Sequence, residues 1–229
     1  MTETGRMQYS ILFSNASRNR GTACVFQQQP GIDPNFLPLA WMTSYSYPST
    51  RIVFQWTLDY DFVWAETGPL VPGVTFVAAQ LVTADLQSSN EITLAYSGGA
   101  LEFQNQRQGV PGKLVITEAS SVPVGGPFSV GVGMGGHATF AQQALPNWSV
   151  VYQPNPQFYI AFGDYSQGEV LDTAALPGTY AQVSFPIGVY SMTAVLNPDN
   201  SWSIMATSER NTALAQARLA NSKAADEPS

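Results

Sequence analysis

Ionisable and reactive side chains are scarce in this sequence. Charged residues make up 11% of its 229 positions, less than half of the share of about 25% in an average globular protein. Cys24 is the only cysteine and His137 the only histidine. A zinc site or a Cys–His catalytic pair needs several nitrogen or sulfur groups in a fixed arrangement. The sequence therefore predicts no metal site, no cofactor and no conventional enzyme, and a lone cysteine excludes an internal disulfide.

Basic residues are especially few. The chain has 9 Lys and Arg against 16 Asp and Glu, which gives a net charge of −7. A surface that binds nucleic acid needs a stripe of basic residues that displaces counterions from the phosphates. The basic residues between Tyr9 and Met205 are Arg18, Arg20, Arg51, Arg107 and Lys113. They are too few to form such a stripe, so we expect no nucleic-acid partner.

Long apolar runs are also missing. No stretch approaches the roughly 20 apolar residues of a membrane-spanning helix. Met1–Ser10 lacks the basic start and the apolar core of a secretory signal. We therefore expect no transmembrane segment, and either a cytoplasmic protein or one exported without a cleaved signal peptide.

Apolar residues nevertheless make up 45% of the chain, enough for a sizeable core. From Gln8 to Met205, short alternating segments are separated by clusters of Gly, Pro, Asn and Ser, the pattern of a sandwich or barrel. We predict an all-β fold, a single antiparallel β-sandwich domain over residues 8–206, jelly-roll-like or Greek-key. Residues 1–7 are expected to be flexible. Residues 207–229 are expected to form a tail with a short helix over Asn211–Asn221, capped by Asn211 or Thr212, and disorder from Ser222 onward.

Two hairpins can be predicted in register. In Glu91–Gln106, a type I′ turn at Gly98-Gly99 would place Leu94 opposite Phe103 and Tyr96 opposite Leu101. In Val189–Met205, a three-residue loop ending at Asn200 would place Leu196 opposite Trp202 and Ala194 opposite Ile204. In both hairpins apolar residues face apolar residues.

The segment Arg51–Ala65 carries an aromatic stripe. Its even-numbered residues are apolar from Phe54 to Trp64, whereas Asp59 and Asp61 lie on the polar parity. A single strand of this length would span about 50 Å, so we expect a bend or turn near Leu58–Asp61. Val74–Val82 lacks clean alternation and is predicted to be a strand buried on both faces.

Several residues invite a chemical role but have a simpler interpretation. His137 follows Gly135-Gly136 and is expected at a turn, and Gly131–Gly136 lacks the following helix that a phosphate loop requires. Cys24 is expected to be a small buried apolar residue. Asp59 with Asp61 could mimic a glycosidase pair, but exposed acids on a polar strand face explain the same pattern. A cation site from Asp164, Glu169 and Asp172 matches no EF-hand loop.

A few aromatic residues lie in polar or turn-like stretches and are the candidate ligand-binding residues. Aromatic rings beside Asp, Asn and Gln offer a flat apolar face with neighbouring hydrogen bonds, which suits sugars or lipid headgroups. The alternative is that these rings cap the edges of the sandwich with their polar atoms in water. The candidates are Tyr45, Tyr47, Trp148, Asp164 and Tyr165.

Three segments, Leu37–Thr43, Ser49–Gln80 and Phe185–Trp202, resemble the RhiA-like proteins of rhizosphere bacteria. The resemblance covers most of Gln8–Met205 and rests on spaced aromatic residues and Pro-Gly turns. It implies an abundant bacterial protein linked to quorum-sensing-controlled, plant-associated life. It supplies no catalytic motif that transfers to numbered positions.

We therefore expect a non-enzymatic binding or surface-interaction protein, with carbohydrate as the preferred ligand class. Two alternatives stay open. One is an acidic, membrane-active sandwich that binds lipid headgroups through aromatic loops, like the aegerolysins, and the other is a glycoside hydrolase that uses carboxylates alone. Because lysines are nearly absent from the strands, strand edges are poorly protected against self-pairing, and we expect a homodimer.

Overall fold

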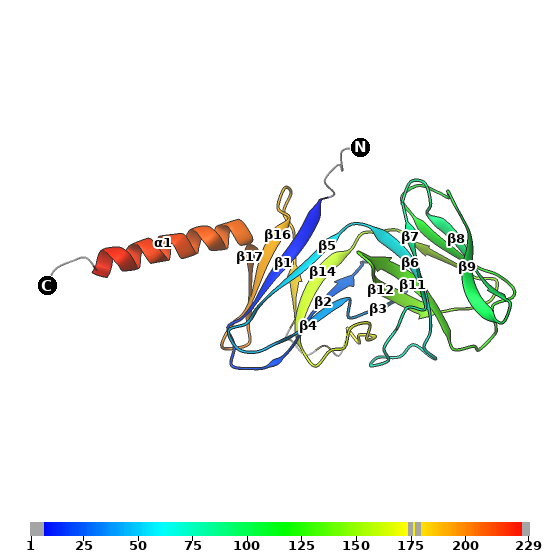
Figure 1. Cartoon of the computed structure of the whole chain (residues 1–229), viewed down its shortest axis with the longest axis horizontal. Helices are drawn as coiled ribbons and strands as arrows, with labels where there is room; N and C mark the ends of the chain where they lie inside the picture. The colour runs from blue at the N-terminus through cyan, green and yellow to red at the C-terminus, as the bar shows by residue number, and fades with distance from the viewer. Residues whose placement is uncertain (1–6, 174–175, 177–179, 226–229) are drawn as a thin grey trace.

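The computed structural model describes residues 7–173, 176 and 180–225, which fold almost entirely into β-strands (Figure 1). The first strands are β1 (Gln8–Asn15), β2 (Gly21–Gln28), β3 (Leu37–Pro38), β4 (Met42–Ser46), β5 (Arg51–Thr57), β6 (Tyr60–Glu66), β7 (Gln80–Ala84), β8 (Glu91–Ser97) and β9 (Ala100–Arg107). The remaining elements are β10 (Leu114–Glu118), β11 (Phe128–Met134), β12 (His137–Gln143), β13 (Ser149–Tyr152), β14 (Gln157–Gly163), β15 (Tyr180–Val183), β16 (Ser191–Leu196), β17 (Trp202–Ala206) and α1 (Thr207–Ala225). The predicted all-β fold is confirmed.

The strands form four sheets that stack in two pairs. In the first pair, β17-β16-β1-β5 faces β15-β14-β2-β4, and Phe13 of β1 stacks on Phe162 of β14 at 5.9 Å between ring centroids. In the second pair, β3-β12-β11-β6-β7 faces β13-β10-β8-β9, and Phe62 of β6 meets Phe103 of β9 at 6.2 Å. Most strand pairings are antiparallel, whereas β1–β16 and β8–β10 are parallel. The predicted sandwich is therefore present as two stacked sheet pairs, seen at the left and right of Figure 1.

The second pair is inserted into the first along the chain. Strands β6 to β13 lie between β5 and β14, both of which belong to the first pair. One apolar cluster nevertheless runs through both pairs and includes Trp41, Trp56 and Phe140. Within the described residues no helix is long and apolar enough to cross a membrane. The prediction of one domain over residues 8–206 stays a prediction, and residues 1–6 and 226–229 lie outside the described part.

Both hairpin predictions are confirmed. Leu94 pairs with Phe103 and Tyr96 with Leu101, across a turn in which Gly98 and Gly99 have φ of 60° and 94°. In the other hairpin Leu196 pairs with Trp202 and Ala194 with Ile204, and Asn200 has φ of 65°. Only residues that tolerate the left-handed region adopt such angles without strain.

The aromatic stripe is confirmed with two corrections. The break expected near Leu58–Asp61 is present at Leu58-Asp59, between β5 and β6, but it turns Leu58 outward, so this residue of the stripe is exposed. Trp56 and Phe62 are buried as predicted. Asp61 is not an exposed acid, however: it is 4% exposed, because β6 is a central strand of its sheet and is covered on both faces.

Two other expectations were wrong. Val74–Val82 is not a doubly buried strand, because residues 74–79 form a covering loop in which Phe76 is buried and Val77 is exposed, and β7 begins only at Gln80. The expected C-terminal helix is present, but its predicted bounds were wrong: α1 begins at Thr207, directly after β17, and continues through Ser222, where disorder was expected, to Ala225. The Thr207 hydroxyl accepts a hydrogen bond from Ser191 and is bonded to that of Thr193, which holds the first turn against the sheet. From there α1 projects away from the body (Figure 1).

Candidate functional site

Three adjoining hollows form one groove on the surface. The first has a volume of about 380 Å³, and it shares Pro72, Leu171 and Asp172 with the second, of about 320 Å³. It shares Pro34 and Leu37 with the third, of about 440 Å³. Each volume lies near the lower end of the range of about 300–1,000 Å³ for ligand pockets. The shared lining residues place the three hollows next to one another, with the first between the other two, and we call the three together the groove.

The groove lies between segments that cover the outer faces of two sheets. Beneath residues 164–172, Cys24 and Phe26 of β2 form an apolar cluster that includes Leu171. Beneath residues 70–76, Val63 of β6 forms a second cluster that includes Phe76. Thr75 and Glu169 form an isolated bridge between the two covers. Because each cover buries apolar surface, the walls of the groove are held by the core.

One wall is a proline-rich turn at residues 69–73. Gly73 has φ of 87°, and its N–H donates to the Val170 carbonyl at 2.9 Å, while the Val170 N–H donates to the Val74 carbonyl at 2.8 Å. The opposite wall is the loop at residues 29–36, in which the Asp33 carboxylate accepts the Asn35 N–H at 2.9 Å. Prolines and an Asx turn favour loops over strands. Both segments are therefore loops, and their side chains line the groove.

The lining is apolar with amide and carboxylate groups. Among the described lining residues of the three hollows there is no Lys, Arg or His. The second hollow carries the carboxylates, whereas the third is lined by the amides of Asn35, Gln142 and Gln143. A groove without a cation offers no partner for a phosphate or sulfate, so its chemistry suits a neutral ligand.

Trp148 lies at one end of the groove. Its side chain is 48% exposed and lines the third hollow with Leu145. The loop that carries both residues is held from beneath by Glu118 at the end of β10, whose N–H donates to the Trp148 carbonyl at 2.8 Å and whose carboxylate accepts the Leu145 N–H. Glu118 is 1% exposed, and burial raises its pKa from 4.5 to about 7. A buried acid therefore positions this end of the groove.

Asp164 and Tyr165 lie at the other end, in the turn after β14. Both line the second hollow, where Asp164 is exposed and Tyr165 is half-buried. The phenol of Tyr165 packs over the cluster of Cys24 and Leu171, and burial raises its pKa. Glu169 and Asp172 line the same hollow. Within the described residues, however, no group of three or more His, Cys, Asp or Glu side chains is placed to hold a metal ion.

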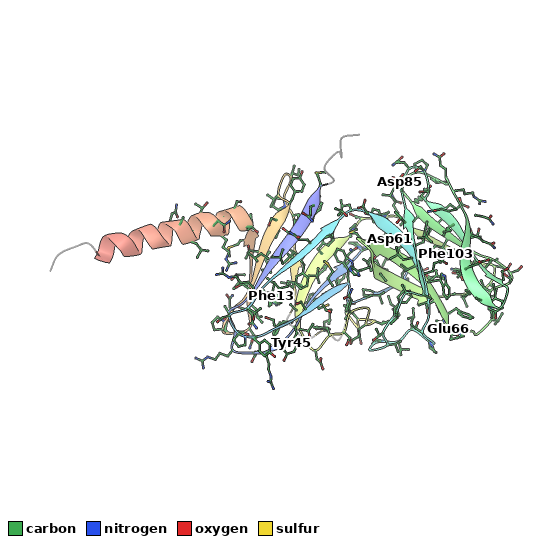
Figure 2. All side chains as sticks on the ribbon, in the orientation of Figure 1. Phe13, Tyr45, Asp61, Glu66, Asp85 and Phe103 are labelled. Atoms are coloured by element: carbon green, nitrogen blue, oxygen red, sulfur yellow. The ribbon has the colours of Figure 1, made fainter. Side chains whose placement is uncertain are left out.

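Tyr45 and Tyr47 lie outside the groove. Tyr45 is on β4, an edge strand, and pairs with Thr22, which in turn pairs with Gly163. The two tyrosine rings contact each other edge to face at 5.2 Å. The structure thus brings Trp148, Asp164 and Tyr165 onto one groove. Tyr45 lies apart from it, at the loop end of the first sheet pair (Figure 2).

The residues that invited a catalytic interpretation meet at a hairpin turn. His137 follows Gly135 and Gly136, which have φ of 60° and 83° in the β11–β12 turn. The buried Asp61 accepts the Gly136 N–H at 3.0 Å, and His137 Nδ1 is 3.0 Å from Gln167 Nε2. The glycine-rich stretch is therefore the end of β11 followed by a β-turn at Gly135-Gly136, in which the Gly136 N–H is bound by Asp61. Cys24 is buried as predicted, and its burial raises the pKa of the thiol.

Comparison with known proteins identifies the relatives of this chain. The RhiA family model matches residues 6–207. The chain belongs to the RhiA family. Protein RhiA of Rhizobium leguminosarum bv. viciae is 36% identical to it over 200 residues, which cover 86% of each chain. No solved structure matches the chain. The RhiA match ends at the first residue of α1, so nearly all of the helix lies outside it.

Sequence reasoning missed most of the groove in this RhiA-family protein. The sequence predicts a strand over Val74–Val82, where residues 74–79 form a covering loop, and it marks no candidate residue in the loop at residues 29–36. The available signal for the adjoining wall was the Pro-Leu-Val-Pro-Gly run at residues 69–73, in which two prolines and a glycine indicate a turn. The sequence does not mark Glu118 either, because a single carboxylate among apolar residues forms no recognisable motif.

Proposed function

We propose that the groove binds an uncharged oligosaccharide and that this RhiA-family protein acts as a binding protein without catalysis. The observation that carries the proposal is that three adjoining hollows with shared lining residues have Trp148 at one end and Tyr165 at the other. A row of three adjoining hollows suits a ligand built of several sugar units. Exposed aromatic rings provide apolar faces for sugar rings, and the amides between them provide hydrogen bonds. A glycan ligand also agrees with the plant-associated life that the family resemblance implies.

The charge of the groove supports a neutral ligand over a lipid headgroup. The carboxylates of Asp164, Glu169 and Asp172 line the second hollow, and no described lining residue is basic. An anionic phosphate placed there would meet like charge without a compensating basic side chain among the described lining residues. A carboxylate-only hydrolase would need an acid and a base on either side of one sugar linkage. The Glu169 carboxylate instead accepts the Ser166 N–H at 2.9 Å within its own turn, which gives it a structural role.

The test is a titration with neutral oligosaccharides of increasing length, followed by calorimetry. Affinity should rise with chain length until the ligand fills the groove, because each hollow adds contacts. Replacement of Trp148 by alanine should weaken binding at least tenfold, which corresponds to about 1.4 kcal/mol. Tyr47→Ala removes an aromatic ring of similar exposure (60% against 48%) outside the groove and should leave affinity unchanged.

Two results would contradict the proposal. Equal loss of affinity in both variants would show that the sugar does not occupy the groove. Release of new reducing ends during incubation, abolished by Asp164→Asn or Asp172→Asn, would show that the protein is a hydrolase.

A further inference from the structure

Three loops meet at one end of the first sheet pair, at the lower left of Figure 1, near the residue labelled Tyr45 in Figure 2. They are the β1–β2 loop at residues 16–20, the β4–β5 loop at residues 47–50 and the β16–β17 loop at residues 197–201. Asn15 joins the first two, since its buried side chain donates to the Asn19 carbonyl at 2.9 Å and its carbonyl accepts the Ser49 N–H at 2.8 Å. The Asn19 side chain donates to that of Asn200 at 2.7 Å. These bonds give the loop end a fixed shape.

This end carries most of the positive charge of the folded body. Arg18 and Arg20 lie in the first loop, Arg51 begins β5, and all three are exposed. Within the part of the chain that the structure describes, none of the three forms an ion pair, whereas Arg107 pairs with Glu91. Asp199 is the acid on the third loop, and its carboxylate accepts hydrogen bonds from Ser201. A chain with a net charge of −7 therefore presents a cationic end.

Two exposed tyrosines accompany the arginines. Tyr45 is 52% and Tyr47 60% exposed, although aromatic side chains elsewhere in this protein are mostly buried. Gly21 pairs with Ser46 across β2 and β4, so continuing the antiparallel register places Arg20 beside Tyr47. We call Arg18, Arg20, Arg51, Tyr45 and Tyr47 the arginine–tyrosine end.

The arginine–tyrosine end forms no part of the cavities described for this protein. None of its residues lines the groove or the two other hollows described, which lie beside His137 and beside Phe185. A small free anion would gain little there, because it would stay in water. A broad anionic surface can meet all three arginines at once. Tyrosine rings, apolar with a polar tip, are characteristic of the membrane–water interface.

We propose that the arginine–tyrosine end docks on the surface of a bilayer containing anionic phospholipids. The arginines attract the phosphate-rich surface, and the tyrosine rings enter the headgroup layer. The groove has no residue in common with this end, so a glycan and a membrane could be held at the same time. The inference is independent of the proposed glycan binding.

The experiment is sedimentation with vesicles of phosphatidylcholine alone or mixed with phosphatidylserine. The protein should bind the mixed vesicles, and binding should fall between about 0.1 M and about 1 M salt as the Debye length shortens from about 10 Å to about 3 Å. Each arginine near an anionic surface is worth about fivefold in affinity. The triple variant Arg18→Gln, Arg20→Gln, Arg51→Gln should therefore lose on the order of a hundredfold.

Control variants distinguish the contribution of the arginine–tyrosine end to vesicle binding from the effects of net charge and of misfolding. Arg107→Gln removes one charge elsewhere and should leave binding unchanged. Tyr45→Ala with Tyr47→Ala should weaken binding to mixed vesicles while preserving its salt dependence. Each variant should keep the thermal melt of the parent, because the replaced side chains are exposed.

Several outcomes would overturn the proposal. They are equal binding to neutral vesicles, no binding to either kind, or an equal loss in the Arg107→Gln variant. A salt-sensitive increase in mass without vesicles, lost in the triple variant, would instead assign this end to the acidic surface of a second copy.

Discussion

Replacing Glu118 by glutamine should stabilise the protein at alkaline pH and leave its stability at acidic pH unchanged. Glu118 is almost fully buried, one of its carboxylate oxygens has no hydrogen-bond partner, and the other accepts the Leu145 N–H. Burial disfavours the ionised form and raises the pKa from 4.5 to about 7. A glutamine has nearly the same shape and can still accept the Leu145 N–H, but it has no charge to bury.

The direction and size of this pH effect on the free energy of unfolding follow from proton linkage. Below pH 4.5 the carboxyl is protonated in both the folded and the unfolded chain. Between pH 4.5 and about 7 the unfolded chain loses this proton first, so the free energy of unfolding falls as pH rises. With 1.36 kcal/mol per pKa unit, the total fall is about 3 kcal/mol, a large fraction of typical stability.

Urea unfolding followed by tryptophan fluorescence at several values between pH 5 and 8 would measure the effect. The glutamine variant should lack most of the pH dependence and exceed the parent by about 3 kcal/mol at pH 8. Some dependence should remain in both proteins, because burial also raises the pKa of Asp61. Glu102→Gln, an exposed carboxylate on β9, is the control and should follow the parent. Parallel pH profiles for the parent and Glu118→Gln would refute the reasoning.

Three further predictions concern the core, metal and association. Trp56→Ala should cost roughly 3–5 kcal/mol in urea unfolding, because Trp56 contacts Trp41, Phe158 and Phe185; a loss below about 1 kcal/mol would contradict its role in the core. Chelator should leave the melting temperature unchanged, and a drop restored by calcium would reveal a carboxylate site. Light scattering should show a homodimer, since edge strand β13 carries no lysine and exposes Val151; a mass fixed at 24.7 kDa up to high micromolar concentration would contradict this.

Local patterns predicted the parts of the fold that local physics determines. The hairpin at Gly98-Gly99 could be predicted in register, because turn type and apolar pairing impose the same alignment. The break at Leu58-Asp59 followed from strand length alone. Neither the division into two sheet pairs nor the parallel pairing of β1 with β16 has a local signature, since both depend on which distant strands meet.

The candidate site was predictable only in part for the same reason. Trp148 and Tyr165 were recognised as aromatic residues in polar stretches, but their position on one groove depends on Pro72, Pro34 and Leu171, which join the three hollows. The prediction for Val74–Val82 was wrong because a loop that covers the outer face of a sheet also contains a run of apolar residues. In the sequence such a run cannot be distinguished from a buried strand. The burial of Asp61 likewise depends on the Gly136 N–H, contributed from 75 positions along the chain.

The insertion of β6–β13 between β5 and β14 determines the order in which the chain can fold during synthesis. The second sheet pair, apart from the two-residue β3, is built from consecutive strands and can close as soon as β13 leaves the ribosome. The first pair must wait, because β1 needs β16 as its parallel neighbour. Until then β1 and β5 expose an apolar face that includes Phe13 and Trp56. The apolar face of the N-terminal strands therefore stays uncovered until β14 and β16 are synthesised, and this is the stage at which chaperones would be needed.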